Sequence, residues 1–243
     1  GSFSACHRAR EVSHAVVPPC AAGNPGGLPT PYPSVARGSR RALDGPKLSR
    51  HPVHPRAKVS LSIRRVTRSE ASRLGELAAR LFREAYGPTH PEPTLSTYLA
   101  ACFSADAIAA RLGEPAHSAL VVENPSGDWL GYAELHAGPP EGPHISVARP
   151  LPSVRGLEIV RFYVARSQHG RGVAQALMAA AEDLALAAGC DAIWLQAWQE
   201  APQALRFYQK VGFEVYGTAT FAFGTRTDHD YLLVKALRAA ATA

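Results

Sequence analysis

The feature that most constrains the fold of this chain is a strand, a glycine-rich turn and a helix that follow one another directly. Residues 156–164, GLEIVRFYV, are rich in β-branched and aromatic side chains, as is typical of a strand. The turn that follows contains Gly170 and Gly172, and an apolar stripe with helical spacing runs over residues 174–188. Gly189 is suited to end that helix. This succession predicts a fold of the mixed α/β class.

The segments on either side alternate between strand and helix patterns, with one strand–helix–strand crossover in the middle. Strand patterns cover residues 58–67, 118–123, 129–137, 191–198, 213–223 and 230–237. Helix patterns cover residues 70–85, 94–103, 104–113 and 202–211. Residues 138–152 are rich in proline and glycine and are expected to form a loop. Three prolines, Pro88, Pro91 and Pro93, are expected to separate the first two helices.

The first part of the chain differs from the rest in composition and charge. It shows no sustained periodicity, and Pro, Gly, Ser and Arg are frequent. Residues 1–58 hold nine of the 26 Lys and Arg but two of the 20 acidic residues, which leaves 17 basic and 18 acidic residues in the remainder. We therefore expect a disordered basic tail at residues 1–57 and one folded domain at residues 58–238. The net charge of +6 belongs to the tail, so a nucleic-acid-binding domain is not indicated.

The cellular compartment is constrained by what the sequence lacks. It has no run of about 18 apolar residues, so no membrane span is expected. Its cysteines, Cys6, Cys20, Cys102 and Cys190, have neither CxxC spacing nor a nearby His, so neither a metal site nor a disulfide framework is expected. A reducing, cytoplasmic location fits best. The acid-poor, Arg-rich tail also suits an organelle transit segment or the remnant of a cleaved chain, and these alternatives stay open.

The glycine-rich turn is suited to binding phosphate. Gly170 and Gly172 can take positive φ angles and allow a ligand close to the backbone, so that several N–H groups converge at the start of the next helix. The turn has neither the GxxxxGK[ST] of a Walker loop nor the GxGxxG of a dinucleotide-binding fold. Taken alone, it could equally be a tight structural turn.

The same turn resembles the defining motif of the GNAT superfamily of acetyl-CoA N-acetyltransferases, a strand followed by [Q/R]xxGx[G/A] and a helix. His169 stands at the first motif position, directly after Gln168, and ALRFYQKVGF resembles the AxxFYxxxGF element of the family. The resemblance covers residues 58–237. It implies a mixed, mostly antiparallel sheet flanked by helices, with acetyl-CoA as cosubstrate.

The resemblance also implies which residues hold the cofactor. They are Phe162, Tyr163, Val164, Gln168, His169, Gly170, Arg171, Gly172, Val173 and Ala174. A backbone N–H near Tyr163 or Val164 is expected to meet the thioester carbonyl oxygen. The Arg171 side chain is suited to the pyrophosphate or the adenosine phosphate, and the alternative is a solvent-facing helix residue.

Within the family, LFREAYG, LEIVRFYV, IWLQAW, FAFG and TDHDYLLVKAL resemble the PaiA-type polyamine N-acetyltransferases. That subgroup usually has an Asn where this chain has Ala201, so one cofactor contact is expected to be missing or replaced.

Two residues are candidates for proton transfer. Glu158 is the only acid in its apolar strand and is expected to serve as general base through water. The alternative for Glu158 is an ion pair with Arg161. Tyr208 occupies the position where the family usually has a general acid, which would protonate the departing thiolate. The alternative for Tyr208 is a core aromatic beside Phe207.

These features predict an N-acetyltransferase that moves an acetyl group from acetyl-CoA to a primary amine of a small molecule, with a polyamine as the best single candidate. The alternative acceptors are a protein N-terminus, an amino acid or an antibiotic. A different class of function, a CoA-binding module without turnover, is favoured slightly by His169 and Ala201 and opposed by Tyr208. We expect acceptor specificity to lie in residues 81–112 and 138–155. A homodimer is left open.

Overall fold

A computed structural model describes residues 14–15, 60–90, 92–223 and 226–237. The chain divides into two compact units; one of them, residues 20–59, lies outside the described residues, and all elements below belong to the other. The expected tail at residues 1–57 therefore falls outside the described part, apart from His14–Ala15. Its disorder and the domain boundary stay predictions.

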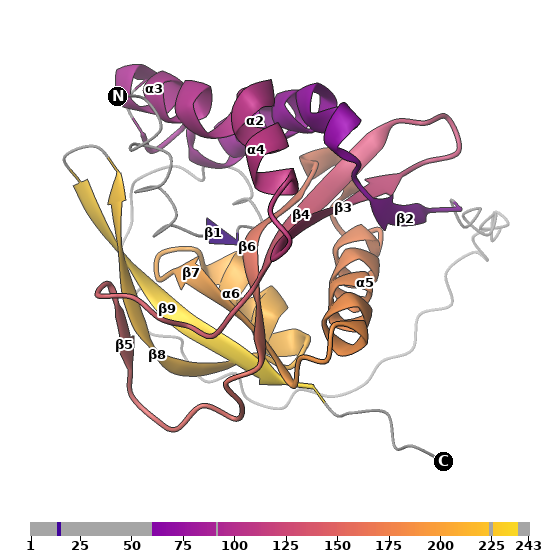
Figure 1. Cartoon of the computed structure of the whole chain (residues 1–243). Helices are drawn as coiled ribbons and strands as arrows, with labels where there is room; N and C mark the ends of the chain where they lie inside the picture. Colours follow the sequence, from indigo (N-terminus) through magenta and orange to yellow (C-terminus); the bar gives the residue numbers. More distant parts are fainter. Residues whose placement is uncertain (1–13, 16–59, 91, 224–225, 238–243) are drawn as a thin grey trace, which may run out of the picture. The chain divides into compact units, whose positions relative to one another are not determined.

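One mixed sheet of nine strands organises the fold (Figure 1). The strands are β1 (His14–Ala15), β2 (Ser62–Arg65), β3 (His117–Glu123), β4 (Trp129–Ala137), β5 (Ile145–Val147), β6 (Gly156–Val164), β7 (Ala192–Trp198), β8 (Glu214–Phe223) and β9 (Arg226–Ala236). Their order is β2-β3-β4-β6-β7-β9-β8-β5, with β1 beside β6. The β6–β7 and β1–β6 pairs are parallel and the other pairs are antiparallel. The expected fold class is confirmed.

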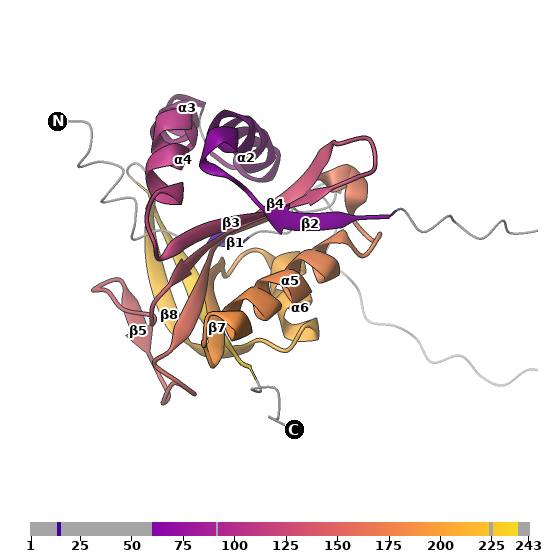
Figure 2. The same cartoon turned by 45° about the vertical axis from the view of Figure 1, so that its right-hand side comes forward.

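Helices cover both faces of this sheet. They are α2 (Ala71–Tyr86), α3 (Glu92–Phe103), α4 (Ala105–Leu112), α5 (Val173–Ala187) and α6 (Pro202–Lys210), with short 3-10 turns at Arg68–Glu70 and Arg166–Gln168. Figure 2 shows α2, α3 and α4 on one face of the sheet and α5 and α6 on the other. Each face has its own apolar core. Among the described residues, every helix is too short or too polar to span a bilayer.

A shift in the register of β6 decides which of its side chains face which helices. Arg161 pairs with Glu134, but the next pair along β4 joins Leu135 to Ile159, so Val160 is an extra residue. An extra residue of this kind inverts the alternation of side chains along a strand. Ile159 lies in the core beside α5, whereas Arg161 lies on the face of α2, α3 and α4, as Glu158 does. The shift thus puts Glu158 and Arg161 on one face.

The pairing of β6 with β7 ends early. The two strands pair from Gly156 to Glu158, opposite Ala192 to Trp194. Further along, β6 pairs with β1 instead, through Arg161 and Phe162. Both strands continue beyond their last common pair, and β1 lies between them there, so the opening between β6 and β7 is occupied by β1. The part of β6 that borders this opening, residues 159–164, leads into the glycine-rich turn.

The structure departs from the sequence-based expectations at three places. The strand expected from residue 58 onward is β2, which begins at Ser62, because Ser60 and Leu61 lie outside it; residues 58–59 are outside the described part of the chain. The expected loop at residues 138–152 contains β5, which pairs with β8 at the edge of the sheet. The prolines do not all lie between the helices, because Pro93 is in the first turn of α3, where its missing N–H costs no helical hydrogen bond.

We predict that deleting residues 1–57 leaves the domain folded, because the two main cores consist of residues from position 61 onward. Deleting residues 1–67 serves as the comparison, since it also removes β2 and its pairing with β3. Thermal melting followed by circular dichroism should give a parent-like transition for the first deletion and a lower melting temperature for the second. Loss of folding in the first deletion would place the domain boundary upstream of residue 58.

Candidate active site

The glycine-rich turn forms an open cradle of backbone groups at the start of α5. Gly170 and Gly172 have φ angles of 72° and 82°, a conformation that other residues rarely adopt. A Cβ atom at either position would meet no atom within 4 Å. Gly172 is the N-cap of α5 and no side chain caps that end, so the first N–H groups of the helix stay available to a ligand. This arrangement fits a phosphate group.

The end of β6 directs a further N–H group toward the opening in the sheet. The Ala165 N–H donates to the Leu130 carbonyl on β4 at 2.8 Å. Neighbouring residues in a strand direct their backbone groups to opposite edges, so the Val164 N–H is directed away from β4. Two N–H groups were suggested from the sequence as donors to the thioester carbonyl oxygen. The Val164 N–H is directed toward the opening, whereas the Tyr163 N–H is directed toward β4. His169 Nε2 lies 3.2 Å from the Val164 carbonyl oxygen and fixes the turn against the strand.

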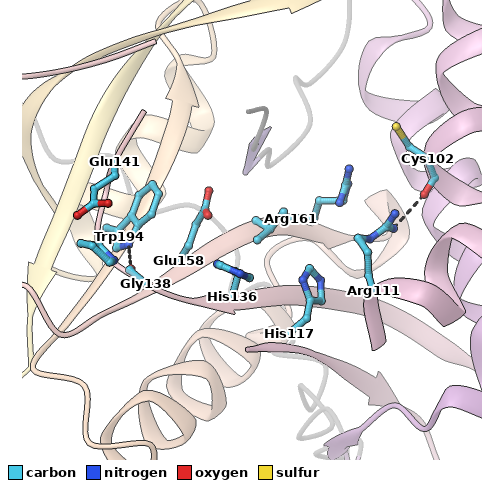
Figure 3. Close-up of a pocket in the computed structure, with 11 residues that line it drawn as sticks. Cys102, Arg111, His117, His136, Gly138, Glu141, Glu158, Arg161 and Trp194 are labelled. Carbon is cyan, nitrogen blue, oxygen red and sulfur yellow. Dashed lines mark hydrogen bonds between the residues drawn. The ribbon is translucent and has the colours of Figure 1, made fainter. Parts of the chain in front are cut away.

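A pocket of about 300 Å³ opens on the face of α2, α3 and α4 (Figure 3). The side chains that line it come from α3, α4, the central strands and the loop after β4. They are Cys102, Arg111, His117, His136, Gly138, Pro139, Glu141, Glu158, Val160, Arg161 and Trp194. Both segments in which acceptor specificity was expected contribute to the lining. Trp194 also donates from its indole N–H to the Gly138 carbonyl at 2.8 Å, which holds the loop against β7.

A buried ion-pair cluster forms the wall of this pocket near the helices. Glu134 accepts from Arg161 Nη1 at 2.7 Å and from Arg111 Nε at 2.5 Å, and His117 Nε2 lies 3.0 Å from it. The Glu134 side chain is 1% exposed and that of Arg161 is 5% exposed. Burial alone would raise the pKa of Glu134, but the two guanidinium groups outweigh it and hold the pKa well below its usual value. Glu134 is therefore a carboxylate at neutral pH.

Glu158 lines the same pocket and is half-buried. Arg161, its alternative partner on sequence grounds, forms an ion pair with Glu134 on the neighbouring strand. Figure 3 shows the carboxylate of Glu158 on the same side of the strands as Arg161, toward Glu141 and Trp194. The geometry is compatible with a base that faces a bound acceptor.

Tyr208 is on the other face of the sheet. Its side chain is fully buried beside Phe162, Phe207 and Phe213, with the Phe162 and Tyr208 ring centroids 6.4 Å apart. Within the described part of the chain its hydroxyl has no hydrogen-bond partner. Burial raises the pKa of Tyr208 well above its ordinary value of 10, so the hydroxyl keeps its proton. The hydroxyl of Tyr132 has the same property, so burial without a partner makes Tyr208 available as a proton donor and does not by itself identify one.

The remaining sequence candidates lie around the cradle. Arg171 is exposed at the turn and Gln168 is half-buried, whereas Val173 is buried at the start of α5. Ala201 is the N-cap of α6 and supplies no side-chain hydrogen bond there. The sequence analysis did not identify Glu134, Arg111 or His117. The one available signal was a charged residue, Glu134, within the apolar strand pattern of residues 129–137.

Comparisons with known proteins agree with this geometry. The acetyltransferase (GNAT) family pattern matches residues 76–213. An uncharacterised N-acetyltransferase of Mycobacterium tuberculosis is 30% identical over 169 residues, which are 70% of this chain and 99% of that protein. The PaiA N-acetyltransferase of Thermoplasma acidophilum, solved in complex with coenzyme A, superposes with a TM-score of 0.56 at 16% identity and covers 73% and 99% of the two chains. Arabidopsis thaliana NAA60, solved with a bisubstrate analogue, gives a TM-score of 0.55 at 14% identity over 74% and 100%.

The fold and the cradle therefore define a coenzyme A-dependent acyltransferase. The chain belongs to the acetyltransferase (GNAT) family, and it is an N-acetyltransferase that uses acetyl-CoA as cosubstrate. The family resemblance drawn from the sequence is confirmed, including the likeness in fold to a PaiA-type enzyme. Two features of this chain fit acetyl-CoA: the open cradle at Gly170 and Gly172, and the buried, partnerless hydroxyl of Tyr208.

We predict that Gly172→Asp weakens acetyl-CoA binding at least tenfold, because it brings a side chain and a negative charge to the amide groups of the cradle. Gly189→Asp is the matched control, since Gly189 also has a positive φ angle and open space but lies at the other end of α5. The thermal shift caused by acetyl-CoA should be present in the parent and the control and strongly reduced in Gly172→Asp. Equal shifts in both variants would mean that the turn has only a structural role.

Proposed function

We propose that this enzyme transfers the acetyl group directly from acetyl-CoA to the primary amine of a small molecule. The observation that supports the proposal is the opening between β6 and β7. The pocket of about 300 Å³ lies on one face of the sheet at this opening, and Tyr208 lies on the other face. The two substrates would meet there from opposite faces. Direct attack then needs no acyl-enzyme and no nucleophilic side chain.

The donor is held by the backbone. Acetyl-CoA supplies an activated acetyl thioester, and the cradle at Gly170 and Gly172 holds its phosphate groups. The β6 edge at Arg161 and Phe162 offers hydrogen-bonding groups to an extended chain, as its pairing with β1 indicates. In this proposal β1 leaves that edge when the donor binds.

The acceptor must reach the thioester as a neutral amine. An alkylamine with a pKa of about 10.4 is only about 0.04% neutral at pH 7, so a base or a desolvating site has to take its proton. Glu158 lines the pocket at the last β6–β7 pair and is the carboxylate that we assign to this role, directly or through water.

Two further groups stabilise the negative charge that develops on the thioester oxygen and on the departing sulfur. The Val164 N–H, directed away from β4, donates to the carbonyl oxygen as it becomes negative. Tyr208 keeps its proton at neutral pH and gives it to the departing thiolate. The Tyr208 hydroxyl and Glu158 thus move protons on opposite sides of the reacting carbonyl.

Polyamines are the acceptors suggested by the sequence resemblance, and they belong in the first acceptor screen beside amino acids, antibiotics and peptides with free N-termini. Release of free thiol from acetyl-CoA reports turnover with any of them. A CoA-binding module without turnover is the competing function; acetyl-CoA binding without thiol release across the whole screen would support it. The resemblance of ALRFYQKVGF, which contains Tyr208, to the AxxFYxxxGF element of the family supports catalysis instead.

Tyr208→Phe should lower turnover by about ten- to a thousandfold while acetyl-CoA affinity stays nearly unchanged, because it removes a proton donor used only in the transition state. Loss of a buried hydroxyl without a partner should not lower the melting temperature. Tyr132→Phe is the matched control, since Tyr132 is also fully buried and its hydroxyl also lacks a partner among the described residues. Parent-like turnover in Tyr208→Phe would make Tyr208 a packing residue.

Glu158→Gln should lower turnover and remove the acidic limb of the pH–rate profile. A carboxylate base is active when ionised, so the parent rate falls as the pH drops and Glu158 takes a proton. Gln keeps the shape but does not titrate. The profile should be measured with one acceptor for the parent, the variant and Glu84→Gln, which changes a surface carboxylate of α2 that is 37% exposed. An unchanged acidic limb in Glu158→Gln would assign the base elsewhere.

A further inference from the structure

The pocket on the face of α2, α3 and α4 has opposite charges at its two ends. Figure 3 shows Glu158 and Glu141 toward Trp194, and Arg161 and Arg111 toward the helices. A pocket built for a molecule that carries only amines would need acidic groups along its length. This pocket has two guanidinium groups where the far end of such a molecule would lie.

The cationic end is held rigidly. Glu134 binds the two guanidinium groups through its two carboxylate oxygens, Oε1 to Arg111 and Oε2 to Arg161. Arg111 also donates to the Cys102 carbonyl at 2.9 Å, and the Arg161 guanidinium lies 5.1 Å from the Phe103 ring centroid. Two guanidinium groups thus share one carboxylate in a cluster that lines the pocket. Positions fixed in advance reduce the entropy that a ligand loses on binding.

Guanidinium groups in a partly buried site recognise carboxylate and phosphate groups through paired N–H donors. An ammonium group in the same place would be disfavoured, because a like charge at short distance opposes ionisation and the low dielectric strengthens the repulsion. The second ammonium of a diamine would meet this repulsion. A pocket of about 300 Å³ has room for a small metabolite with both kinds of group.

We infer that the acceptor carries an anionic oxygen group, a carboxylate or a phosphate, in addition to its primary amine. This inference rests on the proposed function. The amine lies at Glu158, next to the opening where the thioester reacts, and the anionic group lies at Arg111 and Arg161. The acceptor is then an amino carboxylate or an amino phosphate rather than a polyamine, and Arg111 is a specificity residue.

The test compares acceptors that differ in one end group. Straight-chain amines of equal length with a methyl, an ammonium, a carboxylate or a phosphate at the far end are supplied with acetyl-CoA, over a series of chain lengths, and thiol release gives kcat/KM. The carboxylate or phosphate series should exceed the methyl and ammonium series at least tenfold at its best length, and the difference should lie mainly in KM. The series with the higher kcat/KM shows whether the anionic group of the acceptor is a carboxylate or a phosphate.

Variants at the cationic end check the assignment. Arg111→Gln should lower the preference for the anionic acceptor over the methyl-ended amine at least tenfold, whereas Arg111→Lys should lower it less because it retains the charge. Arg80→Gln, which changes a surface arginine of α2 that is 52% exposed, should keep the parent preference. The thermal shift with acetyl-CoA shows whether each variant is folded. If Arg111→Gln does not fold, Arg111→Lys is compared with the parent instead.

The outcomes separate this inference from the proposed function. Preference for the diamine or the methyl-ended amine overturns the inference and leaves the acetyltransferase mechanism standing. Acetyl-CoA binding without thiol release for any carboxylate or phosphate amine also overturns it. Absence of both binding and thiol release overturns the proposed function itself.

Discussion

The structure depends on an interruption of backbone pairing in the middle of its sheet. β6 and β7 pair only from Gly156 to Glu158, although both strands continue further. Backbone N–H and C=O groups need partners, and beyond Glu158 the β6 edge finds them in β1. In the proposed mechanism an extended donor takes the place of β1 at this edge. The register shift at Val160 lies just beyond the last common pair and sends Glu158 and Arg161 to one face. In the proposed mechanism this local irregularity lies beside the donor site and arranges the acceptor pocket.

Electrostatics then give the two faces of the opening different roles. On the acceptor face, Glu134 holds Arg111 and Arg161, and removing one partner from such a buried cluster typically costs about 3–5 kcal/mol. On the donor face the surroundings are apolar, and burial keeps Tyr208 protonated. Charged, orienting groups therefore lie where the acceptor must be recognised. In the proposed mechanism the neutral hydroxyl of Tyr208 lies where the leaving group departs.

The sequence predicted the order of elements and the cradle because both depend on local patterns, such as the stripe of α5 and the glycines at 170 and 172. It did not predict β5, since that strand is defined by its long-range pairing with β8. Nor did it find the Glu134 cluster, because Arg111 and Arg161 come from distant segments that only the folded sheet brings together. The register shift at Val160 has no residue signature, so the sequence did not show that Arg161 pairs with Glu134 on the neighbouring strand.

The measurement that tests the central claim most directly is amide hydrogen exchange of the full chain with and without acetyl-CoA. If the donor binds at the interrupted strand edge and the cradle, exchange should slow at residues 162–164 and 170–175. Exchange in α2 should change little, because this helix lies on the acceptor face. Unchanged exchange in both segments, at an acetyl-CoA concentration that raises the melting temperature, would show that the cosubstrate binds elsewhere and would contradict the account.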